Sequence, residues 1–272
     1  MNLKSIIRYI HLNLALKLNL PFYHLGKKVL ASREEYLRIF NEAKKKIYPE
    51  VETFLSNFPN KIDTKWLDEL ALHTQVVVKK NPINYQHGKI LYSILMKYLS
   101  KGHDNLTILE TGTARGFSSI IMSKALKDTK RKGKIFTIDI IPHNMKMIWN
   151  CIDDNDRMKS RKELLNQWSV YMENINFLHG KSKKILKNLN LNRINFAFLD
   201  AEHKYKDLNI EFDYVSRRQK KGDIIFFDDH TPGLFDEVVE FVDKVENQHS
   251  YKINKIMSSN LRGYAYATKL VD

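Results

Sequence analysis

Residues 108–119 read Ile-Leu-Glu-Thr-Gly-Thr-Ala-Arg-Gly-Phe-Ser-Ser. The run begins like a buried strand and ends like the start of an amphipathic helix. Gly112 allows a tight turn that a ligand can approach closely, and Gly116 lets the helix start near the strand. The first amides of that helix favour a ligand carboxylate or phosphate. The spacing differs from the Gly-x-Gly-x-x-Gly of dinucleotide binders, which disfavours a nicotinamide dehydrogenase.

Short apolar runs alternate with helical patterns after this stretch. Such alternation predicts a parallel sheet, with strands at 107–110, 134–140, 176–178, 195–199 and 223–227. The last two runs, 251–257 and 264–269, follow each other without a helix and predict an antiparallel hairpin at the sheet edge. Residues 142–174 are too many for one crossover, so we expect an inserted loop as well as a helix.

The first hundred residues show helical patterns only. Ser32 with Glu35 is a capping box, and Asp63 or Thr64 caps a helix through about Val78. Polar residues interrupt the apolar face of residues 3–18, which excludes a transmembrane span and disfavours a signal peptide. Two interpretations of this segment remain, a helix docked on the protein or a second subunit, or a basic amphipathic helix on a membrane. We expect a helical extension over 1–83 and an α/β domain over 84–272.

Composition narrows the class of protein. The chain has 272 residues, of which 43% are hydrophobic, so it is not disordered. Cys151 is its single cysteine, which excludes an intrachain disulfide and favours a reducing, cytoplasmic location. The net charge of +14 suggests an anionic partner, such as a membrane surface touched by residues 1–20. The basic residues are spread along the chain without a strong Arg/aromatic motif, so nucleic acid is not the expected partner.

Polar residues follow the first three predicted strands. Glu110 ends the first strand and suits a ligand ammonium. Asp139 ends the second strand, where an acid commonly holds a ribose diol. Lys181 and Ser182 follow the third strand, in a turn that would lie beside a nucleoside base. The alternative for each acid is a helix cap or a solvated strand end.

Two acidic clusters follow the fourth and fifth strands. Asp200 stands in Leu199-Asp200-Ala201-Glu202-His203, and Asp228 and Asp229 follow Phe227. Three converging carboxylates repel one another unless a cation lies between them, and oxygen ligands suit Mg²⁺, Mn²⁺ or Ca²⁺ rather than zinc. His203 can then take a proton at neutral pH. His230 fits a ligand, a second base or a helix cap, and the sequence does not choose between these roles.

Together these motifs make residues 84–270 resemble class I S-adenosylmethionine (SAM)-dependent methyltransferases. Within them, the chain is similar to small-molecule O-methyltransferases related to macrocin O-methyltransferase and cephalosporin-hydroxylase-type proteins, with catechol O-methyltransferase more distant. The resemblance implies a Rossmann-like seven-stranded sheet, mostly parallel with an antiparallel C-terminal hairpin, behind an all-helical N-terminal extension.

The resemblance also implies roles for individual residues. Asp200, Asp228 and Asp229 match metal-ligand positions for Mg²⁺ or another divalent cation. His203 stands at the general-base position and, with Asp200, would be catalytic. Gln86-His87-Gly88 resembles a segment that approaches the cofactor. The residues implied to contact SAM are Glu110, Gly112, Thr113, Gly116, Phe117, Ser118, Asp139, Lys181, Ser182 and Asp200.

The reaction implied is transfer of the SAM methyl group to a hydroxyl of a small molecule, sugar or glycan, in natural-product or polysaccharide modification. The resemblance also makes a homo-oligomer the expected assembly. Two other functions remain open, a methyltransferase for RNA or another macromolecule, and a non-catalytic SAM-binding protein. The sequence does not specify the acceptor.

Overall fold

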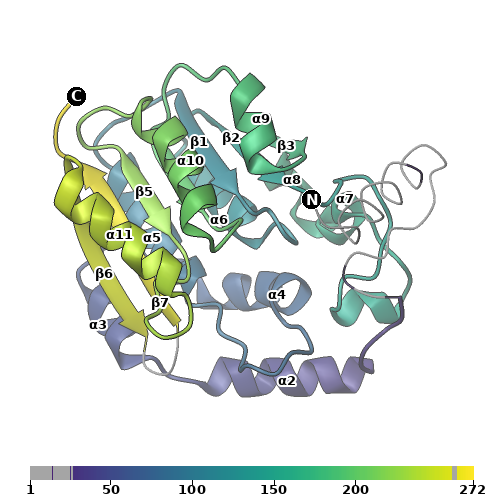
Figure 1. Ribbon diagram of the computed structural model, residues 1–272. Coiled ribbons are helices and arrows are strands. Elements are labelled where there is room, and N and C mark those ends of the chain that lie inside the picture. The colour runs from purple at the N-terminus through teal and green to yellow at the C-terminus, as the bar shows by residue number, and fades with distance from the viewer. Residues whose placement is uncertain (1–13, 15–24, 26, 259–261) are drawn as a thin grey trace.

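The computed structural model describes Leu14, Leu25 and residues 27–258 and 262–272 (Figure 1). Apart from Leu14, the helix expected within residues 3–18 and the membrane contact expected from residues 1–20 lie outside the described residues. Within the described part of the chain, no helix combines the length and the apolar character that crossing a membrane requires.

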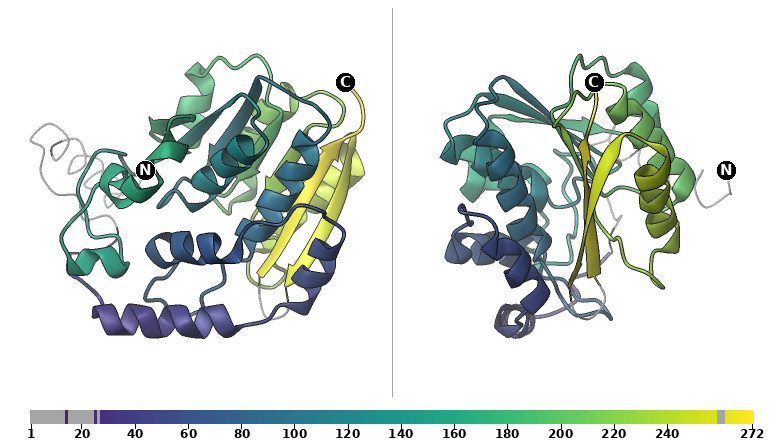
Figure 2. Two further views of the ribbon diagram at one scale, coloured as in Figure 1. Left: turned by 180° about the vertical axis from the view of Figure 1, so that it is seen from behind. Right: turned by 90° about the vertical axis from the view of Figure 1, so that its left-hand side faces the viewer.

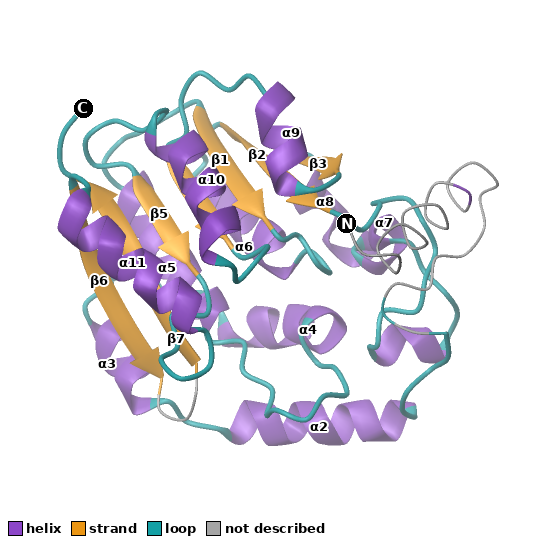
Figure 3. Cartoon of the chain, viewed as in Figure 1, coloured by secondary structure: helices purple, strands orange, loops and turns teal. Residues whose placement is uncertain are grey.

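A seven-stranded sheet forms the centre of the molecule (Figure 3). The strand order is β3-β2-β1-β4-β5-β7-β6, with the first five strands parallel and β7 antiparallel to both β5 and β6. This topology confirms the predicted fold class, including the C-terminal hairpin. The strands are β1 (Leu106–Thr111), β2 (Gly133–Asp139), β3 (Ile175–His179), β4 (Phe196–Leu199), β5 (Ile224–Phe227), β6 (Tyr251–Ser258) and β7 (Arg262–Lys269).

Helices cover both faces of the sheet (Figure 2, right). On one face lie α5 (His87–Leu99) and α6 (Phe117–Asp128), and on the other lie α9 (Ser182–Asn188), α10 (Tyr205–Ser216) and α11 (Asp236–Gln248). Strand residues alternate between the two layers, as the period of two requires. In β1, Ile108 joins the core beneath α5 and α6, whereas Leu109 joins the core beneath α10 and α11.

Three helices precede this domain, α2 (Arg33–Lys45), α3 (Pro49–Ser56) and α4 (Thr64–Thr74). Figure 1 shows α2 and α4 beyond the carboxyl ends of β1 and β5. The backbone NH of Glu35 donates to the Ser32 Oγ, and the backbone NH of Trp66 donates to Asp63, so both N-caps form. The Glu35 carboxylate binds Arg38, so the second half of the predicted capping box is not made. Buried residues of α3 and α4 share one hydrophobic cluster with α5 and α6. The extension therefore packs on the domain, and the boundary near residue 83 stays a prediction.

The helix expected through Val78 ends four residues earlier, at Thr74. The backbone of Val78 is instead bound by a side chain from another part of the chain. Its NH donates to the Asn150 Oδ1 (3.0 Å), and its carbonyl accepts from the Asn150 Nδ2 (3.0 Å). This two-bond pairing keeps the segment after α4 extended.

Asn150 belongs to the segment between β2 and β3, whose short elements are the 3₁₀ helices η1 (Ile152–Asn155) and η2 (Asn166–Trp168) and the helices α7 (Arg161–Leu164) and α8 (Ser169–Met172). The segment packs against the N-terminal helices. The Tyr36 hydroxyl on α2 donates to the Asn150 Oδ1, and the His73 Nδ1 on α4 lies 2.5 Å from the Asp153 Oδ2. Cys151 is free and buried.

Candidate active site

The glycine-rich turn after β1 lies in direct contact with the end of β4. Gly112 has a φ of +92°, and a Cβ there would lie 2.1 Å from the Asp200 carbonyl oxygen. Gly116 has a φ of +93°, and a Cβ there would lie 2.6 Å from a methyl group of Leu165. Only glycine combines the left-handed backbone with this lack of space. The two glycines therefore bring the turn against the acidic end of β4 on one side and the inserted segment on the other.

Glu110 lies beneath this turn and is completely buried. The hydroxyls of Ser118, Ser119 and Thr137 all donate to its carboxylate. Burial raises the pKa of Glu110, against the lowering effect of these three hydrogen bonds. The carboxylate thus ties β1 to β2 and to the start of α6, and within the structure its partners are internal side chains.

Three further residues that the resemblance assigned to the cofactor are buried beside Glu110. Ser118 is one of its hydrogen-bond donors. Thr113 shares a hydrogen bond with the Thr137 hydroxyl, and the Phe117 ring packs edge-on against His87, with ring centroids 4.9 Å apart. These side chains support the turn from below.

Asp139 links the turn to the loop after β2. Its Oδ2 accepts from the Ala114 backbone NH and its Oδ1 from the Ile141 backbone NH, both at 2.6 Å. The buried Arg161 of α7 donates to the carbonyls of the same two residues, at 2.7 Å and 3.2 Å. Its Nη2 lies 3.7 Å from the Asp139 Oδ2. Nothing local in the sequence marks Arg161, a residue of the insert, as a partner of β2, so this contact was not predicted.

Two hollows flank the carboxyl ends of β2 and β3. The smaller, about 80 Å³, brings together predicted cofactor residues from three strand ends, namely Gly112, Asp139, Lys181 and Ser182, with Ala201 and Glu202 after β4. The larger, about 360 Å³, is lined by residues that include Thr113, His143, Arg161 and Phe177. The edge of the sheet is therefore concave where the sequence predicted a nucleoside.

Glu211 of α10 is fully buried. The Thr111 hydroxyl donates to its Oε2 at 2.8 Å. Burial raises the pKa of Glu211 to about 7. Nothing in the sequence distinguishes this glutamate from the exposed acids of the same helix.

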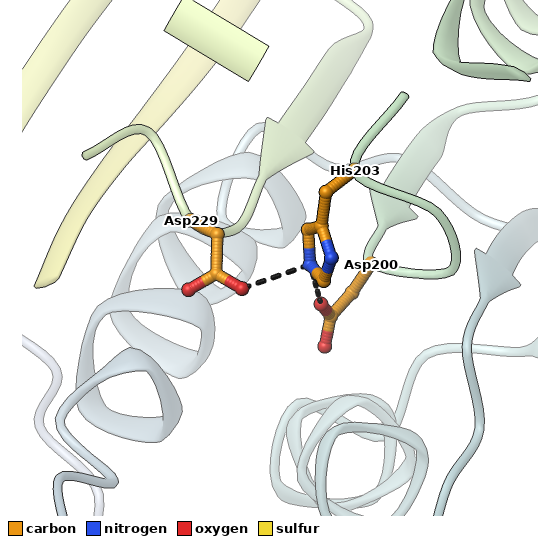
Figure 4. Close-up of side chains that lie close together, drawn as sticks. All are labelled: Asp200, His203 and Asp229. Carbon is orange, nitrogen blue, oxygen red and sulfur yellow. Dashed lines mark ion pairs between the residues drawn. The ribbon is translucent and has the colours of Figure 1, made fainter. Parts of the chain in front are cut away.

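Asp200, His203 and Asp229 lie together at the ends of β4 and β5 (Figure 4), and Asp228, the third aspartate of the predicted cluster, is not among them. The His203 Nε2 lies 2.9 Å from the Asp229 Oδ2 and 4.0 Å from the Asp200 Oδ1. Asp229 has a φ of +56°, a left-handed conformation that few residues other than glycine adopt. Aspartate is among the residues that adopt this conformation most readily, and the Asp229 carboxylate lies beside His203.

The neighbouring charges and burial shift the pKa values of two residues in this cluster. The hydrogen bond with Asp229 raises the pKa of His203. Burial, followed by the charges of Asp228 and Asp229, raises the pKa of Asp200 well above its usual value. The pKa values of Asp200 and His203 are thus both raised, and perturbed pKa values of this kind are frequent at functional sites.

Asp228 lies apart from these three groups. Its side chain is fully buried, and its Oδ2 accepts a hydrogen bond from Arg262 of β7. Its Oδ1 accepts from the Asp229 backbone NH at 2.9 Å. Burial acts to raise the pKa of Asp228, but the Arg262 charge outweighs it and leaves that pKa below its usual value. Arg262 was missed in the sequence, although an antiparallel β7 beside β5 must begin at the carboxyl end of β5.

The three aspartates therefore do not fit the divalent-cation site predicted for them, because the Arg262 cation already occupies the place beside Asp228. Asp200, His203 and Asp229 do bring ligand atoms within 4.8 Å of one another. One of these three is an imidazole, however, and Mg²⁺ and Ca²⁺ prefer oxygen ligands.

The other two histidines singled out in the sequence do not join this cluster. His230 is buried, and the charged groups that act on it are Lys255, Asp243 and Glu246 of β6 and α11. His87 is buried at the start of α5, and burial lowers its pKa to about 3, so its ring stays neutral. His203 is thus the histidine that joins Asp200 and Asp229.

Comparison with known proteins fits this geometry. Residues 109–230 match a methyltransferase-domain family, Methyltransf_24. No curated protein sequence matches the chain. Solved structures share the fold at low identity. They include the O-methyltransferase TomG from Streptomyces achromogenes, solved with SAM (TM-score 0.55, 16% identity, 89% of this chain and 100% of that one). They also include an O-methyltransferase from Bacillus cereus, solved with SAH (S-adenosylhomocysteine; TM-score 0.53, 15% identity, 80% and 97%).

The matched domain and the fold confirm the class inferred from the sequence. The methyltransferase domain matched over residues 109–230, together with the order of the seven strands, supports a SAM-dependent methyltransferase.

Proposed function

We propose that this chain is an O-methyltransferase that transfers the SAM methyl group to a hydroxyl of a small molecule or sugar. The contact between the glycine-rich turn and the cluster of Asp200, His203 and Asp229 is the observation that carries the proposal. Gly112 lies against the Asp200 backbone, so a methyl donor held on the turn lies next to Asp200, His203 and Asp229.

In this proposal the cofactor lies across the carboxyl ends of β1, β2, β3 and β4. Gly112 and Gly116 leave room for its methionine part, and the first amides of α6 face its carboxylate. Asp139 binds the ribose, and Lys181 and Ser182 flank the adenine in the smaller hollow. Glu110, Thr113, Phe117 and Ser118 act from below by holding the turn in shape.

His203 is the proposed general base. Its hydrogen bond with Asp229 orients the ring and makes it a stronger base. Because Nε2 donates to Asp229, the acceptor hydroxyl would lie at the other ring nitrogen, Nδ1, and lose its proton to it as its oxygen attacks the methyl carbon and SAH leaves. Positioning and fixed charges supply the rest of the acceleration.

A screen for SAH release tests the reaction. Wild-type protein is incubated with SAM and a panel of small hydroxyl compounds that includes phenolic and sugar vicinal diols. We expect release with at least one member. His203→Ala should lower turnover by about 10²- to 10⁴-fold, because a positioned base contributes that much. His249→Ala, at the C-terminal end of α11, is the matched control and should retain activity.

Two results would count against the proposal. Release of SAH with none of the hydroxyl compounds but with RNA would favour the macromolecule-methyltransferase alternative. Full activity of His203→Ala on a hydroxyl acceptor would remove His203 as the base. A glycan acceptor is a further proposal, which the same screen tests when glycans are included. A homo-oligomer is also a proposal, and sedimentation of the purified chain tests it.

A further inference from the structure

We propose that Arg262 provides, as a built-in part of the fold, the positive charge that a divalent cation was predicted to supply between the aspartates. The inference rests on the proposed methyl transfer and goes beyond it, since it assigns a positioning residue and makes the reaction independent of divalent metal.

The first support is the contact set of the guanidinium. Arg262 bonds Asp228, and its Nε lies 3.5 Å from the Asp229 Oδ1. Its Nη1 donates to the Asn84 carbonyl at 3.1 Å, in the loop before α5. The Arg262 side chain therefore lies between two neighbouring carboxylates and links them to the loop before α5.

The second support is how tightly the backbone around Arg262 is held. The next residue, Gly263, donates its backbone NH to the Thr231 hydroxyl at 2.8 Å. A Cβ on Gly263 would lie 2.0 Å from the His230 carbonyl oxygen. The start of β7 is therefore in close contact with the residues just after Asp229. This contact fixes the position of the Arg262 backbone, from which the side chain extends.

The third support is the balance of charge. Asp228 and Asp229 face the Arg262 guanidinium, and Asp229 and Asp200 face the His203 ring. A divalent cation between the aspartates would have to displace the half-buried Arg262 guanidinium from the fully buried Asp228 carboxylate. The displaced Arg262 guanidinium would lose its ion pair while it stays half-buried, and this loss opposes cation binding.

In the proposed reaction Arg262 acts through the two carboxylates. By holding Asp228 and Asp229 in place it keeps the Asp229 Oδ2 aimed at the His203 Nε2. The site is then assembled before the acceptor arrives, which is how fixed charges lower a barrier most effectively.

Mn²⁺ titration followed by electron paramagnetic resonance tests the inference without requiring an acceptor. With SAH present, the wild-type chain should leave the signal of free Mn²⁺ unchanged up to millimolar concentration. Arg262→Met should bind one Mn²⁺ at least about tenfold more tightly than wild type, because its three carboxylates become available. Arg217→Met, which removes an exposed arginine paired with Asp213, is the matched control and should behave as wild type.

A wild-type chain that binds one Mn²⁺ tightly, with binding lost in Asp229→Asn, would overturn the inference. If Arg262→Met does not fold, the paired variant Arg262→Met with Asp228→Asn removes both charges, and the wild-type titration still decides. With an acceptor from the screen, EDTA should leave the wild-type rate within about twofold, and a loss of rate restored by Mg²⁺ would also overturn it. SAH binding, measured in parallel, separates these outcomes from failure of the methyltransferase proposal.

Discussion

Gly112 shows how a single residue can set the geometry of the site. Its left-handed backbone and the missing Cβ act together, because the turn crosses the Asp200 carbonyl at a distance that no side chain permits. Gly102 offers a natural comparison, since its φ of +89° is similar but nothing lies within 4 Å of its Cβ position. A side chain at Gly102 would therefore meet backbone strain alone, whereas one at Gly112 would meet both backbone strain and steric overlap.

Gly102→Ala should therefore cost roughly 1–2 kcal/mol of unfolding free energy, the cost of a left-handed alanine. Gly112→Ala should cost about 1–3 kcal/mol more, because the added carbon forces the end of β4 away. Urea unfolding of both variants measures the difference. Equal losses would show that the Gly112 turn has room for a side chain and that the close contact with Asp200 does not form.

At the scale of elements, the insert between β2 and β3 joins the N-terminal helices to the site. Asn150 makes this connection with one side chain, which bonds the Val78 backbone twice and accepts from the Tyr36 hydroxyl. Its φ of +54° suits asparagine, which tolerates the left-handed region better than most residues. The extended segment after α4 is held mainly by these bonds.

Asn150→Gly keeps the backbone unstrained and removes only the side chain. We expect a loss of about 1–2 kcal/mol in unfolding free energy, for the hydrogen bonds removed, and much faster hydrogen exchange at the Val78 amide. Asn188→Gly, on the exposed face of α9, should leave the Val78 exchange rate unchanged. Unaltered exchange in Asn150→Gly would mean that other contacts hold this segment.

The elements differ in how far the sequence predicts them. The turn at Gly112, the cap at Ser32 and the acids after β4 and β5 depend on neighbours along the chain, so local spacing was enough. The end of α4 at Thr74 was missed because it depends on Asn150, 76 positions further on. Arg161 and Arg262 were missed for the same reason, since each acts on strand ends far from it in sequence.

At the scale of the whole molecule, the buried Glu211 makes the stability of the fold depend on pH. Its pKa is about 7 in the folded chain, against an ordinary value of 4.5. The folded state therefore binds this proton more tightly than the unfolded state does. The stability tied to the protonated group is fully present below about pH 4.5 and is lost as the pH rises through about 7.

Glu211→Gln should remove this pH-dependent loss of folding stability, because glutamine does not titrate. The stability of the variant relative to wild type should rise between pH 5 and pH 8 by up to about 3 kcal/mol, the free energy of such a pKa shift. Thermal unfolding across this range measures the difference, and Glu240→Gln, an exposed glutamate on α11, should show none. A constant difference between Glu211→Gln and wild type would mean that Glu211 titrates normally in the fold.

The measurement that tests the central claim most directly is calorimetric titration of SAH into the full-length chain. We predict one binding site of micromolar affinity, weakened at least about tenfold in Asp139→Ala and unchanged in the matched Asp213→Ala. Protein that unfolds cooperatively on heating but gives no heat with SAH would contradict the assignment of the glycine-rich turn and Asp139 to the cofactor.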